Sequence, residues 1–309
     1  MATDQKDSPI WVTGAGGFIG QHLCHNLALK EKTVIGFGFR QFAIAKGHYF
    51  GGGLSSEILN NAVSKFGKPA AVYHLAGGST VGQSIVEPSQ DFNRSVASTS
   101  ILLNFLKNVA REVPVVLASS AAVYGAGHQG PISISATLNP FSPYGFHKRM
   151  VEELGQSFHA TYGQPISIVR LFSVYGEGLR KQLLWDLCNK MRNDETQIIL
   201  GGSGQEVRDW CHVSDVVQLL KHACANNSNG LRYYNGGTGI ATPIHRIADS
   251  VMTFWGGELS IKFSNKSRLG DPVSLIADTN FLPEGQEWAI DINEGIRRYV
   301  AWFKGLPLI

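Results

Sequence analysis

The amino-acid sequence predicts an α/β fold with a doubly wound parallel sheet and a smaller C-terminal α/β lobe. Three observations predict it. Short apolar runs alternate with amphipathic stretches in the first half, a glycine-rich turn follows the first run, and after residue 171 the elements shorten while glycines cluster at 176–178 and 201–204. Repeated strand–helix units of this kind form parallel sheets covered on both faces.

Five apolar runs have the length and composition of buried strands. A helix over Tyr144–Tyr162 is predicted by Ser142 and Pro143, which suit a cap and a first turn, and by Gly163, which suits a helix end. The predicted strands are Ile10–Thr13, Thr33–Phe37, Ala70–Leu75, Val113–Ala118 and Ile166–Leu171.

The segment TGAGGFIG at 13–20 lies between the first strand and a helix that opens at Phe18. Glycine lets the turn tighten and lets the backbone approach a phosphate, and a helix N-terminus offers free N–H groups and a partial positive charge. At a first strand–helix junction this pattern predicts a dinucleotide site in a Rossmann-type domain. The cofactor-binding residues expected here are Gly14, Gly17, Phe18, Ile19 and Gly20.

The end of the second strand bears on the choice of cofactor. An acidic side chain there binds the ribose hydroxyls of NAD, but residues 33–40 (TVIGFGFR) contain no acid and end in Arg40. An arginine can hold a 2′-phosphate with two hydrogen bonds. The sequence therefore favours NADP(H), with NAD(H) as the alternative if Arg40 is only a solvated loop cation.

Composition limits the other function classes. The 309 residues carry a formal charge of +3 and four scattered cysteines, Cys24, Cys188, Cys211 and Cys224, without metal-ligand spacing. The polar segment 1–8 and the absence of a long apolar run favour a cytoplasmic protein outside the membrane. We expect no metal and no nucleic-acid partner, since the basic residues do not form a run.

A catalytic group is predicted where the fourth of these strands ends. Ser120 follows the Val113–Ala118 strand, and Tyr144 and Lys148 lie four residues apart on the next helix, hence on one face. Lys148 and an oxidised nicotinamide would both lower the pKa of the Tyr144 phenol, so that it acts as acid and base. Ser120 would hydrogen-bond the reacting oxygen. His147 lies between the pair, and we interpret it as a packing residue.

These segments together resemble the extended short-chain dehydrogenase/reductase family, specifically its nucleotide-sugar epimerase, dehydratase and reductase branch. The resemblance covers nearly the whole chain. The matching segments are TGAGGFIG at 13–20, YHLAG at 73–77, VGQSIVEP at 81–88 with Asn93 behind it, SSAAVYG at 119–125, SPYGFHK at 142–148, VRLFSVYG at 169–176 and RDWCHVSDV at 208–216.

The resemblance implies roles for particular residues. It makes Ser120, rather than Ser119, the catalytic serine, with Tyr144 and Lys148 as its partners. The chain departs from the family at two places near the adenosine: Gly38 and the stretch Gly51–Leu54 stand where the family usually has aspartates. It places Leu75, Ala76 and Gly77 against the cofactor, and Ser79, Ser120, Arg208, Arg268 and Asp271 against a nucleotide sugar.

The same resemblance implies domain limits and an assembly. We expect a cofactor domain over 1–172, to which part of 205–235 returns, and a discontinuous substrate lobe mainly over 173–309. The family commonly pairs through two helices, for which Pro88–Ala110 and Tyr144–Tyr162 are the candidates. This predicts a homodimer.

The two residues after the catalytic serine narrow the reaction. Family dehydratases have an Asp-Glu pair there and the double epimerase-reductases a cysteine, whereas this chain has Ala121-Ala122, whose methyl groups cannot move protons. NADPH-dependent reduction of a 4-keto(-6-deoxy) sugar and NAD-dependent C4 epimerisation remain, and the apparent NADP preference favours the reductase slightly. A non-catalytic dinucleotide sensor and a reductase of non-sugar carbonyls are more distant alternatives.

Overall fold

The computed structural model describes residues 8–193, 197–256, 260–266 and 272–307. Within them, seven parallel strands form one sheet in the order β12-β7-β5-β4-β1-β2-β3. The strands are β1 (Ile10–Thr13), β2 (Val34–Gly38), β3 (Gly47–Gly51), β4 (Ala71–His74), β5 (Val115–Ser120), β7 (Ile166–Leu171) and β12 (Leu231–Gly236).

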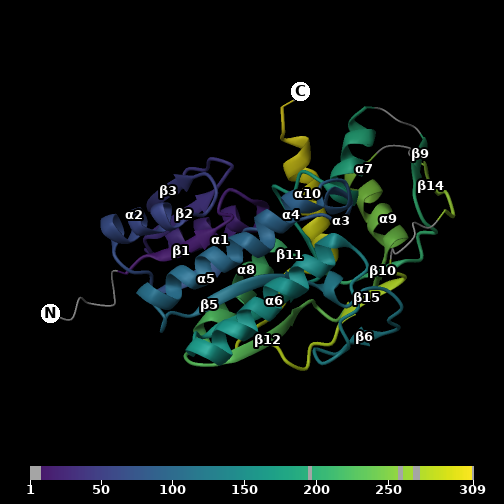
Figure 1. Cartoon of the computed structure of the whole chain (residues 1–309). Helices are drawn as coiled ribbons and strands as arrows, with labels where there is room; N and C mark the ends of the chain where they lie inside the picture. The colour runs from purple at the N-terminus through teal and green to yellow at the C-terminus, as the bar shows by residue number, and fades with distance from the viewer. Residues whose placement is uncertain (1–7, 194–196, 257–259, 267–271, 308–309) are drawn as a thin grey trace.

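The sheet is buried on both faces, as the doubly wound prediction requires (Figure 1). Helices α1 (Phe18–Leu29) and α8 (Val213–Ala225) cover one face, and α2 (Ser56–Phe66), α5 (Ser98–Val109) and α6 (Pro143–Tyr162) the other. Adjacent strand residues point to opposite faces, so that Trp11 packs with the second group and Val12 with the first.

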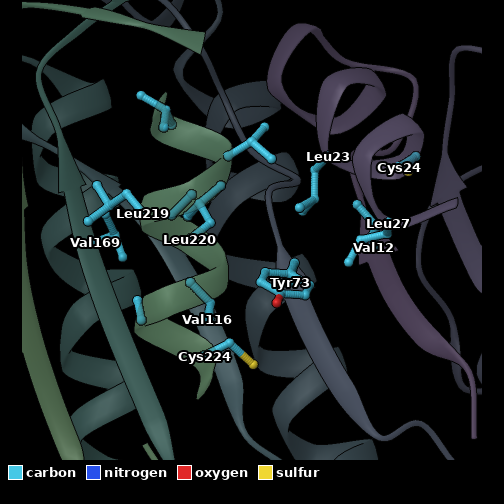
Figure 2. Packing of buried hydrophobic residues seen from close by; sticks show 14 of the residues in the cluster. Val12, Leu23, Cys24, Leu27, Tyr73, Val116, Val169, Leu219, Leu220 and Cys224 are labelled. Atoms are coloured by element: carbon cyan, nitrogen blue, oxygen red, sulfur yellow. The ribbon is translucent and has the colours of Figure 1, made fainter. Parts of the chain in front are cut away.

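Figure 2 shows the first of these packed layers, in which side chains of α1 and α8 meet those of the central strands. Burying each aliphatic side chain contributes about 1.5–3 kcal/mol, so this layer holds the two helices firmly on the sheet. Its labelled members are Leu23, Cys24 and Leu27 of α1, Leu219, Leu220 and Cys224 of α8, and Val12, Tyr73, Val116 and Val169 of the strands.

A smaller lobe, built mainly from segments that follow β7, lies beside the sheet (Figure 1). Its apolar side chains form a core of their own. Its helices are α7 (Gln182–Arg192), α9 (Ile244–Trp255) and α10 (Ile292–Lys304). Its strands form short sheets: β13 (Thr242–Pro243), β10 (Val207–Arg208), β15 (Ser274–Ala277) and β6 (Pro131–Ile132) in one, β11 (Trp210–His212) with β8 (Ser173–Tyr175), and β14 (Ser260–Phe263) with β9 (Gln197–Leu200). The exact limits of two domains stay a prediction.

The five strands predicted from the sequence are confirmed, with ends that differ by at most two residues. The two outermost strands, β3 and β12, are not among those five. Gly51 is the last residue of β3. Both lie at a sheet edge: β3 is glycine-bounded and half-exposed, and β12 is flanked by turn-like sequence on both sides. Neither has the continuous apolar run that marks a central strand.

Helix α6 begins and ends as the sequence predicts. Ser142 accepts a hydrogen bond from the Gly145 N–H, Pro143 occupies the first turn, and Gly163 ends the helix with a φ of 72°. The helix of the other predicted pairing segment is continuous but irregular: α4 (Pro88–Phe92) leads through a π-helical stretch, η1 (Asn93–Ala97), into α5. Such π-helical turns often occur at functional sites.

Candidate active site

The site lies at the carboxyl ends of the strands around β1. The chain leaves β1 towards β2 and β3 on one side, while β4, β5, β7 and β12 lie on the other. Ligands of open α/β sheets bind in the crevice at such a reversal of strand order. The glycine turn after β1, the loop after β4 and the end of β5 are therefore brought to one edge.

Gly14 lies where the glycine turn passes close to the loop after β4. Its φ is 67°, and a Cβ at this position would lie 2.8 Å from backbone atoms of both Leu75 and Ala76. A larger residue would push the turn away from the loop that follows β4. The two segments that are expected to hold the cofactor therefore contact each other directly.

The N-terminus of α1 is suited to a pyrophosphate. Its N-cap residue, Gly17, has no side chain to accept a hydrogen bond from the first turn, and no acidic residue lies in that turn. The backbone N–H groups of Phe18 and Ile19 are thus available to an anion, and the helix dipole favours negative charge there. Gln21 donates to the Gly16 carbonyl at 2.9 Å and steadies the turn. The residues present fit a dinucleotide.

Arg40 lies beside this turn. Its backbone carbonyl accepts a hydrogen bond of 2.6 Å from the Tyr49 hydroxyl, and the same carbonyl occupies the space that a Cβ on Gly16 would need. The Arg40 side chain is exposed. Its position is compatible with an adenosine phosphate, but its role in cofactor choice stays a prediction.

Ser120, Tyr144 and Lys148 meet at the end of β5. The Ser120 side chain is hydrogen-bonded to Tyr144. The Lys148 ammonium donates to the Ala118 carbonyl at 2.9 Å and lies 5.9 Å from the centre of the Tyr144 ring. A Cβ on Gly77 would lie 3.1 Å from the same ammonium, so Lys148 also faces the loop after β4. The predicted constellation is therefore present.

Burial dominates the titration of this pair. It raises the pKa of Tyr144, which the hydrogen bond from Ser120 lowers and the charge of Asp91 raises further. Burial also lowers the pKa of Lys148 to about 8, although Asp91 and Glu152 both act to raise it. The expectation that Lys148 and an oxidised nicotinamide together lower the pKa of Tyr144 concerns the cofactor-bound site and stays a prediction. In the protein alone, the pKa of Tyr144 is raised. Without a cofactor, desolvation of the phenolate outweighs the ammonium.

The two adjacent serines have different partners, which the sequence alone does not establish. The Ser119 hydroxyl is buried and donates to Glu152 at 2.5 Å, while Glu152 forms a buried ion pair of 2.8 Å with Arg170. Arg170 also donates to the Tyr124 hydroxyl at 2.8 Å. Ser119 is thus held by a structural network, and Ser120 is the serine next to Tyr144. Glu152 lies eight residues after Tyr144, on the same helix face, which is the signal that could have identified it.

The predicted substrate residues are only partly placed. The Ser79 carbonyl, after β4, accepts a hydrogen bond of 3.1 Å from Lys181, which precedes α7. Arg208 lies on β10 in the smaller lobe, where it donates to the Val207 carbonyl at 2.9 Å. Arg268 and Asp271 lie outside the described residues. The substrate roles of all four stay predictions. The contact of the Lys181 ammonium with the loop after β4 is not indicated by the sequence.

Two further features bear on the class of protein, namely grouped metal ligands and membrane-spanning helices. In the described ranges, no three His, Cys, Asp or Glu side chains are grouped so that they could hold a metal ion. None of the helices described is both long and apolar enough to cross a bilayer.

A glycine turn at the crossover of a parallel sheet, next to a Ser–Tyr–Lys group, defines an extended short-chain dehydrogenase/reductase enzyme. The sequence profile of the "NAD dependent epimerase/dehydratase family" matches residues 10–237. The chain belongs to this family.

Individual relatives cover almost the full length. The chain is 29% identical over 308 residues to a "Putative UDP-glucose 4-epimerase" of Methanocaldococcus jannaschii, with 96% of this chain and 98% of that protein covered. MoeE5, solved in complex with UDP-glucose and NAD, is 27% identical with a TM-score of 0.86, covering 96% of this chain and 99% of its own. The UDP-glucose 4-epimerase from Brucella ovis, in complex with NAD, is 25% identical with a TM-score of 0.87, covering 96% and 98%.

Proposed function

We propose that the protein is a nucleotide-sugar 4-epimerase that inverts the configuration at C4 of a UDP-hexose with tightly held NAD. The observation that carries the proposal is the group formed by Ser120, Tyr144 and Lys148, with Ala121 and Ala122 after the serine in place of further acid or base groups. Such a site can oxidise a carbinol and reduce a ketone, and the alanines cannot assist in removing water or in shifting protons beside the ketone.

The chain's own residues account for the proton chemistry. When bound, the nicotinamide would supply the acceptor and donor for the hydride exchanged with C4. Tyr144 takes the proton of the C4 hydroxyl as the ketone forms and gives it back when the ketone is reduced from the opposite face. Ser120 hydrogen-bonds the same oxygen, and Lys148 supports the phenolate with its positive charge.

The comparisons support the epimerase over the reductase that the sequence favours slightly. Relatives that match over nearly the whole chain carry the names of UDP-glucose 4-epimerases, and structures with TM-scores of 0.86 and 0.87 hold NAD. An epimerase recycles its cofactor, so NAD without net consumption fits this reaction. NADP(H)-dependent reduction of a 4-keto sugar is a second candidate, and the absence of an acid at the end of β2, with Arg40 beyond it, favours it.

The two candidates differ in what they consume. We would incubate the purified protein with UDP-glucose and NAD, and separately with a nucleotide 4-keto-6-deoxy sugar and NADPH. The proposal predicts formation of the C4 epimer with no net change in reduced-nicotinamide absorbance. Stoichiometric loss of NADPH with the keto sugar, and no epimer from UDP-glucose, would establish the reductase instead.

We also propose a homodimer built on α6 and on the helix over 88–109. These helices carry apolar side chains that remain exposed in the single chain, namely Phe92, Phe146 and Met150, which we call the bundle face. Phe146 and Met150 are four residues apart and so lie on one side of α6. Apolar side chains grouped in this way mark interaction surfaces.

A further inference from the structure

A buried acid and a buried histidine lie behind the catalytic pair, where the proposed reaction does not use them. Asp91 of α4 and His147 of α6 are 6% and 9% exposed, and the Asp91 carboxylate lies 2.5 Å from His147 Nδ1. A contact this short between an acid and an imidazole has the character of a charge-assisted hydrogen bond. It links α4 to the helix that carries Tyr144 and Lys148.

The same carboxylate packs on the loop after β4. Its other oxygen occupies the space that a Cβ on Gly78 would need, so a larger residue at position 78 would displace the Asp91 carboxylate. The Gly78 N–H donates to the Ser95 hydroxyl at 2.9 Å, and Lys148 faces the preceding Gly77. The loop expected to contact the cofactor is therefore enclosed by η1 and α4 on one side and by α6 on the other.

Asp91 is also the charge that acts on both members of the catalytic pair. It raises the pKa of Tyr144, which opposes the phenolate, and it raises the pKa of Lys148, which favours the ammonium. An unpaired Asp91 would thus hinder Tyr144 as a base. A protonated His147 would offset that effect without removing the carboxylate from the loop.

We propose that the Asp91–His147 ion pair is a positioning device that clamps the Gly77–Gly78 loop to the catalytic helix and neutralises the carboxylate beside Tyr144. The positioning role rests on the proposed function only in taking Tyr144 as the acid–base. Asp91 and His147 do not themselves exchange protons with the substrate.

Other titratable groups surround the pair but do not replace it. Burial lowers the pKa of His74, on β4, to about 3, so that His74 carries no charge at working pH. Glu152 lies one helical turn beyond Lys148 and is paired with Arg170. The charged groups nearby on α4 and η1, Glu87 and Arg94, are exposed to solvent.

The test compares variants that remove the two charges separately. We would titrate Tyr144 in the NAD-bound protein as the ultraviolet absorbance of tyrosinate, by difference from the same background carrying Tyr144→Phe. Asp91→Asn should lower the midpoint by roughly one pH unit, and His147→Gln should raise it by a similar amount, because nearby charges shift a pKa by about that much or more. The double variant should return close to the wild-type midpoint.

The control is Glu87→Gln, which removes an exposed charge from the start of the same helix and should leave the midpoint unchanged. Opposite shifts in the two single variants would support the charge role. Shifts in the same direction, or none, would overturn it, because a merely structural pair gives no reason for opposite signs. The titration needs no turnover, so a failure of the proposed epimerisation would leave this result readable.

The clamping role is tested separately, by measuring the affinity for NAD. Both single variants should weaken NAD binding several-fold, since either one loosens the loop from α6, whereas Glu87→Gln should not. Unchanged NAD affinity in both variants would remove the clamp from the proposal. Melting temperatures measured beside the titration identify any variant that fails to fold. In that case the double variant, which buries neither charge, is the deciding measurement, and a midpoint displaced from that of the wild type would overturn the charge role.

Discussion

Lys148 shows how a single residue of this site opposes the stability of the fold. The residue is 5% exposed and its pKa falls to about 8 because burial disfavours the charge. Below pH 8 the residue is charged in both the folded and the unfolded chain, and the folded state carries the cost of desolvation. Between pH 8 and the ordinary value of 10.5, only the unfolded chain retains the proton, so the cost is progressively relieved as the pH rises.

Replacing Lys148 by Met should therefore abolish turnover yet stabilise the protein at neutral pH. The gain is about 3 kcal/mol at most, the equivalent of the lowered pKa, reduced by loss of the hydrogen bond to Ala118. Urea unfolding at pH 7 and near pH 10 checks this, and the advantage of Lys148→Met should shrink at the higher pH. A variant that is less stable than wild type at pH 7 would show that the ammonium does not destabilise the fold.

The residues in and around the candidate active site can be predicted from the sequence to different degrees. Ser120, Tyr144 and Lys148 are recognisable because their spacing follows helix and strand geometry. The ion pair of Asp91 with His147 is not, since the two residues are 56 positions apart and meet only through helix packing. His147 is buried against the Phe92 ring, in keeping with its interpretation as a packing residue, and its contact with Asp91 is an addition that the sequence does not indicate.

At the scale of elements, α6 is fixed to the sheet by a charged contact as well as by apolar packing. Tyr144, Lys148 and Glu152 occupy successive turns of one face, and Glu152 pairs with Arg170 on β7. Breaking a buried ion pair leaves an uncompensated charge, which costs far more than losing an exposed pair. The position of the catalytic pair therefore depends on a residue that has no part in the chemistry.

Glu152→Gln should destabilise the protein by about 3–5 kcal/mol, because Arg170 is left buried without its anion. It should also lower the pKa of Lys148 further, since Glu152 acts to raise it. The matched control is Glu153→Gln, whose side chain is 58% exposed in a pair with Arg149 and should cost less than about 1 kcal/mol. Equal losses in the two variants, measured by chemical denaturation, would contradict the role given to Glu152.

The sheet itself is predictable from sequence where its strands are central, and less so at its edges. Continuous apolar runs such as that of β5 indicate burial on both faces, but β12 has polar residues and joins the sheet by pairing with β7. The order of strands is expected only from the fold class. Pairing between distant segments is a tertiary property that local patterns do not encode.

At the scale of the whole molecule, the smaller lobe is the part expected to decide what the site accepts. The substrate residues expected in the smaller lobe rest on the resemblance alone, and two of them, Arg268 and Asp271, lie outside the described residues. The base and the sugar of the substrate are selected by the pocket and not by the fold, because the same architecture serves many reactions.

The proposed homodimer should have about twice the 33.6 kDa mass of the chain in sedimentation experiments. Placing acidic residues on the bundle face by Phe146→Asp with Met150→Asp should convert it to a monomer, since like charges would face each other across a symmetric interface. The control, Leu29→Asp, changes an exposed apolar residue on α1 and should leave the mass unchanged. A wild-type protein that sediments as a monomer at micromolar concentration would contradict the dimer.

The central claim, that C4 is oxidised and then reduced with the same hydrogen, is tested most directly by an isotope. UDP-glucose carrying deuterium at C4 would be incubated in ordinary water with the wild-type protein and NAD, and with Tyr144→Phe as the control. The account predicts a C4 epimer that retains deuterium at C4, and a loss of turnover in the variant with NAD still bound. An epimer in which deuterium has exchanged for solvent hydrogen, or unimpaired turnover without the Tyr144 hydroxyl, would contradict it.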